Sequence, residues 1–278
     1  MIAFESDWQS ADGVNIHGLG WEPNQKPRAV VCLVHGLGEH IGRYEHVAKA
    51  LTWPGYAIFG FDQRGHGRSG GPRGHTPSYE TLMQDIDDLL ARARQRYLRL
   101  PLFLYGHSMG GNEVINYGLR RKPDLAGVIA TSPYLRLAFP LPPARERLAR
   151  IADRIAPGLT QRSGLETAAL SHDPRVIDAY IHDPLVHDKI TPRLFTGLRD
   201  SGEWAIAHAR EFPLPLLLMH GSADRLTSPD ASREFAHAGG SHITLQIWDG
   251  CYHELHNEAD QEEVFKLMVI WMDARLAL

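Results

Sequence analysis

The sequence predicts an α/β fold in which helices cover both faces of a mostly parallel sheet. Short, continuously apolar runs recur along the chain, as expected for strands buried on both faces, and helical patterns alternate with them. The length agrees with this class, because 278 residues suffice for one large domain with an insertion. Hydrophobic residues make up 43% and charged residues 22%, which is ordinary for a folded globular protein.

The expected elements alternate along the chain. A hairpin is expected within residues 2–22, where Asp12-Gly13 provides the turn. The strands expected after it are 29–34, 56–61, 102–105, 127–131, 216–220 and 243–248. The helices expected between and after them are 44–51, 78–97, 109–121 and 261–274, and 78–97 carries a clear amphipathic stripe.

This alternation stops after residue 133. Residues 134–210 hold no convincing strand, and a Pro-rich apolar stretch is followed by a short amphipathic helix with one apolar face, formed by Leu148, Ile151, Ala152 and Ile155. The sequence therefore predicts a core of residues 1–133 and 211–278 and a helical cap of residues 134–210 over the sheet.

Composition and charge argue against several classes of protein. The net charge of -4 is unsuited to a nucleic-acid-binding protein, and no apolar run approaches the roughly 18 residues of a membrane span. The first residues lack the apolar segment of a signal peptide, and two cysteines are too few for a disulfide framework, so we expect a cytoplasmic protein. Whether Cys251 is a reactive thiol is left open. The histidines show no metal-ligand spacing, and neither a metal nor a cofactor is expected.

The most specific motif is Gly106-His107-Ser108-Met109-Gly110, which lies between an expected strand and an expected helix. G-x-S-x-G in that context is typical of a nucleophile elbow, a tight turn that presents the serine hydroxyl at the carboxyl end of the sheet. Glycines are needed because side chains at the flanking positions would clash. Ser108 is therefore the predicted nucleophile.

A serine nucleophile needs a base and an acid that orients the base. Asp224 and His253 follow two later strands in the order that this elbow requires, in loops at the carboxyl ends of those strands. His256 is the alternative base. The alternative acids are Asp249 and Asp230, of which Asp230 is better interpreted as a helix N-cap.

A tetrahedral oxyanion needs two backbone donors. Met109 directly follows the predicted nucleophile, and Leu37 lies in the loop after the first core strand. These two N–H groups are the predicted oxyanion hole.

Taken together, these segments resemble the monoacylglycerol lipase family of serine hydrolases, which have the α/β-hydrolase fold. The resemblance rests on seven motifs: the segments 35–44, 65–69, 106–111, 132–133, 183–185, 221–225 and 252–258. It implies cleavage of a fatty acyl ester of glycerol without a cofactor, beneath a cap that touches membranes or micelles. It also implies that polar contacts to glycerol come from Arg43, His107, Tyr180 and His256.

The cap and the ester class leave alternatives open. Burial of a fatty acyl chain gains about 0.8 kcal/mol per methylene, and a tunnel could be lined by Leu135, Leu137, Phe139 and Ile151. The same residues could instead only pack the cap onto the core. A lysophospholipase or a general carboxylesterase would use the same triad, whereas a ligand-binding descendant of the fold would have lost part of it. The sequence carries no signal for an oligomeric state.

Overall fold

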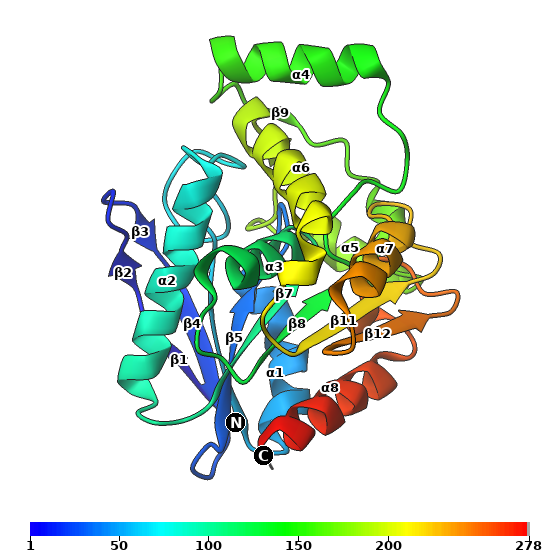
Figure 1. The fold of residues 1–278 in the computed structure, drawn as a ribbon. Coiled ribbons are helices and arrows are strands. Elements are labelled where there is room, and N and C mark those ends of the chain that lie inside the picture. The colour runs from blue at the N-terminus through cyan, green and yellow to red at the C-terminus, as the bar shows by residue number, and fades with distance from the viewer. Residues whose placement is uncertain (277–278) are drawn as a thin grey trace.

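The computed structural model describes residues 1–276 and is organised around one large sheet (Figure 1). Its eight strands lie in the order β1-β4-β6-β5-β7-β8-β11-β12. The six strands from β6 to β12 pair in parallel, and β4 and β1 add an antiparallel edge. The strands are β1 (Ile2–Glu5), β4 (Gly18–Glu22), β5 (Ala29–Val34), β6 (Tyr56–Phe61), β7 (Leu102–His107), β8 (Gly127–Thr131), β11 (Leu216–Gly221) and β12 (Ile243–Trp248). The predicted α/β-hydrolase fold is confirmed.

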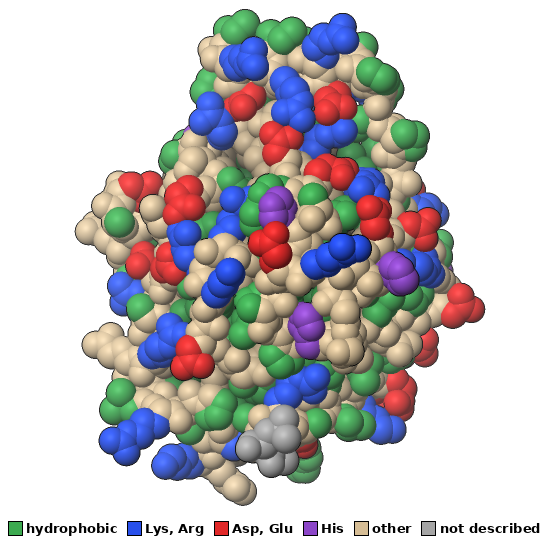
Figure 2. Space-filling model, viewed as in Figure 1, with side chains coloured by type: hydrophobic (Ala, Val, Ile, Leu, Met, Phe, Trp, Pro, Cys, Tyr) green, Lys and Arg blue, Asp and Glu red, His purple; other side chains and the backbone are tan. Residues whose placement is uncertain are grey.

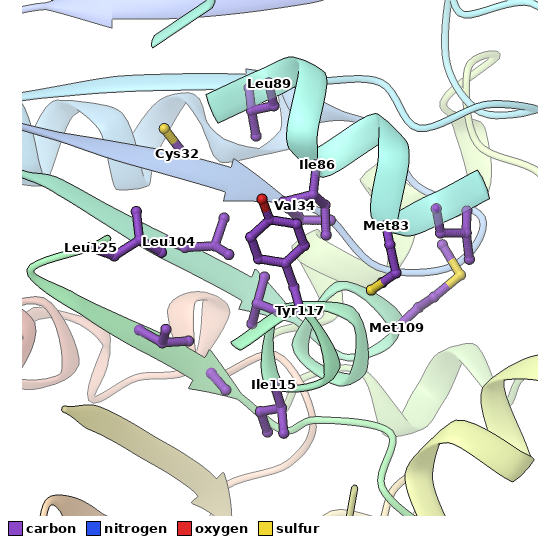
Figure 3. Packing of buried hydrophobic residues seen from close by; sticks show 14 of the residues in the cluster. Cys32, Val34, Met83, Ile86, Leu89, Leu104, Met109, Ile115, Tyr117 and Leu125 are labelled. Carbon is purple, nitrogen blue, oxygen red and sulfur yellow. The ribbon is translucent and has the colours of Figure 1, made fainter. Parts of the chain in front are cut away.

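Helices cover both faces of the sheet, so the central strands are apolar on both sides. In β5, Val30, Cys32 and Val34 face one cluster of buried side chains, and the alternate residues face the other. The first cluster is covered by α2 (Tyr79–Arg96), α3 (Met109–Arg121) and α7 (Pro229–Gly239). Figure 3 shows part of it, with Leu89 and Ile115 on either side of Leu104. The second is covered by α1 (Glu45–Thr52) and α8 (Gln261–Leu276).

Most of the core elements begin and end near the predicted residues. The hairpin exists, since β2 (Trp8–Gln9) pairs with β3 (Asn15–Ile16) around the turn at Gly13. Helix α2 begins after Ser78, whose hydroxyl caps it by accepting from the backbone N–H of Thr81. A short 3₁₀ helix, η1 (Ile41–Tyr44), precedes α1, and two others are η3 (Ala209–Glu211) and η4 (Leu255–Asn257).

The elements between β8 and η3 all lie outside the large sheet. They are α4 (Pro143–Ile155), β9 (Gln161–Arg162), η2 (Thr167–Ala169), α5 (Pro174–His182), β10 (Lys189–Ile190) and α6 (Pro192–Ala207). The prediction of no strand here was wrong, because β9 pairs with β10; two residues are too short to show alternation in a sequence. The proposed division into core and cap rests on this separation.

Helix α4 lies farthest from the sheet, where it packs against α6 (Figure 1). None of its residues is buried, and Leu148, Ile151 and Ile155 are exposed. Apolar and basic side chains lie together over this end of the molecule in Figure 2. Within residues 1–276, no helix combines the length and the hydropathy that crossing a bilayer would need.

Candidate active site

The elbow at Ser108 is a strained turn that only its glycines permit. Ser108 has φ 54° and ψ -111°, between the end of β7 and the first residue of α3. A Cβ atom on Gly106 would lie 2.2 Å from the carbonyl oxygen of Gly110, and one on Gly110 would lie 2.1 Å from that of Val34. Side chains at either position are therefore excluded by close backbone contact, and Ser108 is presented at the carboxyl end of the sheet.

The predicted acid and base are in direct contact. His253 Nδ1 lies 2.7 Å from Asp224 Oδ2, and both side chains are buried. The other carboxylate oxygen, Oδ1, accepts from the backbone N–H groups of Leu226 and Thr227 at 2.8 and 3.1 Å. Asp224 is thus fixed in one orientation, and the bond to Nδ1 leaves His253 Nε2 free for a proton transfer.

The electrostatics of this pair favour a proton on His253. Burial alone would lower the pKa of His253, but the charge of Asp224 and the hydrogen bond to it outweigh burial and raise that pKa above its usual value. Burial opposes ionisation of Asp224, yet the charge of His253 and the hydrogen bonds from His220 and His253 hold the pKa of this carboxyl far below its usual value. The imidazolium form of His253 is consequently stabilised.

The alternative residues lie elsewhere. His256 stacks on Tyr44 and has no contact with Asp224; burial lowers the pKa of His256 to about 3. Asp249 accepts a hydrogen bond from Ser222 at the exposed end of its loop. The interpretation of Asp230 as an N-cap was wrong, because Ser228 caps α7 and Asp230 lies in its first turn.

A cavity of about 310 Å³ opens at Ser108 and runs beneath the cap. Ser108, His253, Leu37 and Met109 line it together, so the structure brings the predicted nucleophile, the predicted base and both predicted oxyanion residues to one place. The loop of Leu37 lies directly over the elbow, since a Cβ atom on Gly36 would lie 3.3 Å from Ser108 Cβ. Met109 is the first residue of α3, where a backbone N–H has no acceptor within the helix.

The remaining wall of the cavity is mainly apolar and comes largely from the cap. Its apolar residues are Tyr134, Leu137, Phe139, Leu141, Leu165, Ile190, Phe195, Leu198 and Leu226. Of the four residues expected to line an acyl tunnel, Leu137 and Phe139 line this cavity. Leu135 is instead buried in the core, and Ile151 is 46% exposed on α4. The amphipathic pattern of α4 identified a helix but not the direction in which its apolar face points.

The four residues expected to contact glycerol lie in two pairs beside the cavity. The Arg43 guanidinium lies 4.8 Å from the centre of the Tyr180 ring, and the rings of His107 and His256 lie 4.8 Å apart. None of the four is among the residues that line the cavity. His107 also packs against His253 at 4.8 Å and is buried, which holds its pKa well below its usual value. Their role as substrate contacts stays a prediction.

Buried acids that the sequence analysis missed hold Arg43. Arg43 donates to Glu39 at 2.6 Å and to both oxygens of Glu254 at 2.9 Å. Glu39 also accepts from the backbone N–H of Gly36 at 2.6 Å. This buried network, Glu39–Arg43–Glu254, therefore joins the Leu37 loop to the His253 loop. No local pattern marks it, because Arg43 and Glu254 are 211 positions apart in the sequence.

Two other residues connect the loops of the site. Ser132 has φ 44°, and its hydroxyl donates to the carbonyl oxygen of His253 at 2.7 Å. Thr227 donates to Asp224 Oδ2 at 2.9 Å.

Cys251 is buried, and burial together with nearby acids raises its pKa to about 11, so the thiol is protonated near neutral pH. In the part of the chain that the structure describes, no three His, Cys, Asp or Glu side chains are arranged to hold a metal ion.

Comparison with known proteins identifies the family. Residues 25–260 match the family model described as serine aminopeptidase, S33. A monoacylglycerol lipase of Mycolicibacterium smegmatis is 34% identical over 98% of this chain and 98% of its own length. An uncharacterised abhydrolase domain-containing protein of Dictyostelium discoideum is 37% identical over 99% of this chain, which spans only 30% of that protein.

A solved structure agrees with these sequence relatives. The crystal structure of Paleococcus ferrophilus monoacylglycerol lipase has a TM-score of 0.84 and 35% identity, and the match covers 99% of this chain and 100% of that one. The chain therefore belongs to the α/β-hydrolase family of serine hydrolases in which the monoacylglycerol lipases fall.

Proposed function

We propose that this protein hydrolyses monoacylglycerols to a free fatty acid and glycerol through an acyl-enzyme on Ser108. The observation that carries the proposal is the mainly apolar cavity that Ser108 and His253 line together, with His253 hydrogen-bonded to a buried Asp224 at 2.7 Å. Ester hydrolysis is the activity that fits the family; the acylglycerol as substrate is the finer part of the proposal.

In this mechanism His253 Nε2 takes the proton of Ser108 Oγ as that oxygen attacks the ester carbonyl. The N–H groups of Leu37 and Met109 stabilise the oxyanion; loss of one such donor typically costs about 3–4 kcal/mol of transition-state stabilisation. The imidazolium then protonates the leaving alcohol, and Asp224 stabilises the charge on the ring. Water activated by His253 finally cleaves the acyl-enzyme and regenerates Ser108.

The acyl chain lies along the apolar wall of the cavity, where Leu137, Phe139 and Leu198 replace its contacts with water. The alcohol leaves on the side of the Tyr180–Arg43 pair. Tyr180 supports this placement, since a Cβ atom on Gly38, next to Leu37, would lie 3.1 Å from the Tyr180 hydroxyl.

Contact of the cap with a lipid surface is the second part of this proposal. Leu148 is 64% and Ile155 is 79% exposed on α4, in a helix that also carries Arg147 and Arg154. An amphipathic helix with this composition binds reversibly at the surface of a bilayer or micelle. Such contact would bring the cavity to the substrate.

Arg145 favours a second candidate, a lysophospholipid. Arg145 lines the cavity, and its neighbour Glu146 pairs with Arg150 and Arg199. A guanidinium at that position could bind a phosphodiester. Arg145→Gln should then lower kcat/KM for lysophosphatidylcholine and leave monoacylglycerol unaffected.

The test is kcat/KM on monoacylglycerols of graded chain length, on p-nitrophenyl esters and on lysophosphatidylcholine. We expect monoacylglycerol to be preferred, and Ser108→Ala to abolish all turnover and fluorophosphonate labelling without a change in Tm. Ser241→Ala, an exposed serine before β12, is the matched control and should behave as the wild type. Turnover of nitrophenyl esters with no turnover of monoacylglycerol would reassign the protein as a carboxylesterase. An active Ser108→Ala variant would refute the mechanism.

A further inference from the structure

A second buried histidine contacts the acid of the proposed triad. His220 lies at the carboxyl end of β11, and its side chain is 0% exposed. Its Nε2 atom lies 3.0 Å from Asp224 Oδ2, the same oxygen that accepts from His253. On the opposite side of the ring, His220 Nδ1 lies 2.8 Å from the hydroxyl oxygen of Ser232, in α7.

These neighbours determine which ring nitrogen carries the hydrogen. An ionised carboxylate can only accept, so the contact with Asp224 is a hydrogen bond only if His220 Nε2 carries the hydrogen. In the neutral ring His220 Nδ1 is then an acceptor, and the hydroxyl of Ser232 is the donor that faces it. Thr227, the remaining polar neighbour of the ring, is uncharged.

The bonds around Asp224 leave its carboxylate no freedom to turn. The backbone N–H groups of Leu226 and Thr227 occupy Oδ1, while His220 and the Thr227 hydroxyl approach Oδ2 beside His253. A carboxylate oxygen has two lone pairs, and His220 and His253 fill those of Oδ2 when the Thr227 hydroxyl donates to its other acceptor, the carbonyl oxygen of Ser132 at 3.0 Å. Asp224 is thereby held with one direction open toward His253 Nδ1.

We infer that His220 is a positioning residue of the active site, which orients Asp224 toward His253, and that Ser232 positions His220 in turn. This inference rests on the proposed serine hydrolase mechanism. It extends the series of interacting side chains from the triad of Ser108, His253 and Asp224 to His220 and Ser232. His220 does not touch the substrate. It acts by fixing the direction of the Asp224–His253 bond and by sharing the negative charge of the carboxylate.

Loss of the His220 donor has two separate consequences. First, Asp224 keeps its backbone bonds at Oδ1 but loses one of the donors that direct Oδ2, so His253 spends less time in the orientation and tautomer that accept the Ser108 proton, and kcat falls while substrate binding is unaffected. Second, the charge of Asp224 is shared with fewer donors and acts more strongly on His253. The pKa of His253 should then rise further. The charged and titratable groups that face His253 besides Asp224 are Glu254, Glu39, His107 and His256, and replacement of His220 leaves all four in place.

The experiment compares His220→Leu, His220→Gln and Ser232→Ala over the pH range of kcat/KM, with a soluble nitrophenyl ester. For H220L we expect kcat to fall roughly 10-fold with little change in KM, as for loss of a hydrogen bond to a charged group. The acid limb of the pH–rate profile, the fall in kcat/KM as His253 becomes protonated, should move up by roughly half a pH unit. H220Q retains an N–H donor and should recover most of the activity. S232A should shift the limb in the same direction, by less.

The matched control is His17→Gln. His17 is also buried and bound to an aspartate, with 2.8 Å between its Nδ1 atom and Asp7 Oδ1, but it lies near the opposite edge of the sheet. The His17→Gln substitution should leave kcat and the acid limb unchanged. H220L with the kcat and acid limb of the wild type would overturn the inference. If H220L does not fold, S232A decides, because an unmoved acid limb in that variant also overturns it.

Ser108→Ala, measured alongside, separates the two proposals. An active S108A variant would refute the hydrolase mechanism itself. An inactive S108A variant, with H220L equal to the wild type, would refute only the role of His220.

Discussion

Replacement of Arg43 by methionine should destabilise the fold more than any surface change. Arg43 is the only cation in the Glu39–Arg43–Glu254 network, and the side chain of Arg43 is 10% exposed, that of Glu39 3% and that of Glu254 2%. Methionine fills a similar volume without charge, so two carboxylates would stay buried without a compensating positive charge.

The magnitude follows from the cost of breaking a buried ion pair on one side. Removal of one partner typically costs about 3–5 kcal/mol, because the other charge stays desolvated. Here one guanidinium serves two acids, with contacts of 2.6 and 2.9 Å, so we expect the upper half of that range at pH 7. That loss is about a quarter or more of the roughly 5–15 kcal/mol that stabilises a typical domain.

The stability lost in the Arg43→Met variant should depend on pH in a definite direction. Burial alone would raise the pKa of Glu254, but Arg43 holds it below its usual 4.5, so its contribution to stability is full above pH 4.5 and is lost as the pH falls through the lowered value. Without Arg43, burial raises the pKa of Glu254, and the acid takes up a proton in the folded state. The difference between variant and wild type should therefore shrink between pH 7 and pH 5.

Urea denaturation followed by circular dichroism at both pH values measures this difference. Arg68→Met is the matched control, since Arg68 and Glu5 form an exposed pair at 3.0 Å that should contribute less than about 1 kcal/mol. A loss below about 1 kcal/mol for R43M at pH 7, or an equal loss at both pH values, would refute the reasoning.

Three further predictions concern the site and the cap. Gly110→Ala should abolish activity and lower Tm, because its Cβ atom would lie 2.1 Å from the carbonyl oxygen of Val34; a folded, active variant would contradict the elbow geometry. The acid limb of kcat/KM should lie above 6.5, because His253 must be neutral to accept a proton and its pKa is raised; a pH–rate profile with a limb below that value would contradict it. Leu148→Asp with Ile155→Asp should reduce turnover of micellar monoacylglycerol and leave a soluble ester unaffected; equal losses on both would argue against surface docking.

The sequence predicts the strands of the sheet and the elbow well because each is marked by a pattern within one short segment. Continuous apolar runs such as Ala29–Val34 are typical of buried parallel strands, and the glycines around Ser108 reflect contacts within one turn. The positions of Asp224 and His253 follow from topology, since loops at the carboxyl ends of neighbouring parallel strands meet.

What the sequence could not predict depends on contacts between distant segments. Arg43 was expected near glycerol, and no local signal indicated that Glu39 and Glu254 would surround it. Ile151 lies on the apolar stripe of α4, but a stripe does not say whether a helix faces a cavity or the solvent. His220 is four residues from Asp224 on a strand and a loop, where spacing alone does not imply contact.

The buried charges around the cavity also bear on how a reaction product would leave. Glu39 and Glu254 carry two negative charges against the single positive charge of Arg43, and Asp224 adds another. Under the proposed function and with His253 neutral, a neutral ester enters this surplus of negative charge without penalty, whereas the fatty acid released from it ionises, is repelled there and is attracted by Arg145, which lines the cavity from α4. The charges around the cavity would thus favour release of the carboxylate. Long-chain fatty acids should inhibit more strongly at a pH low enough to protonate them.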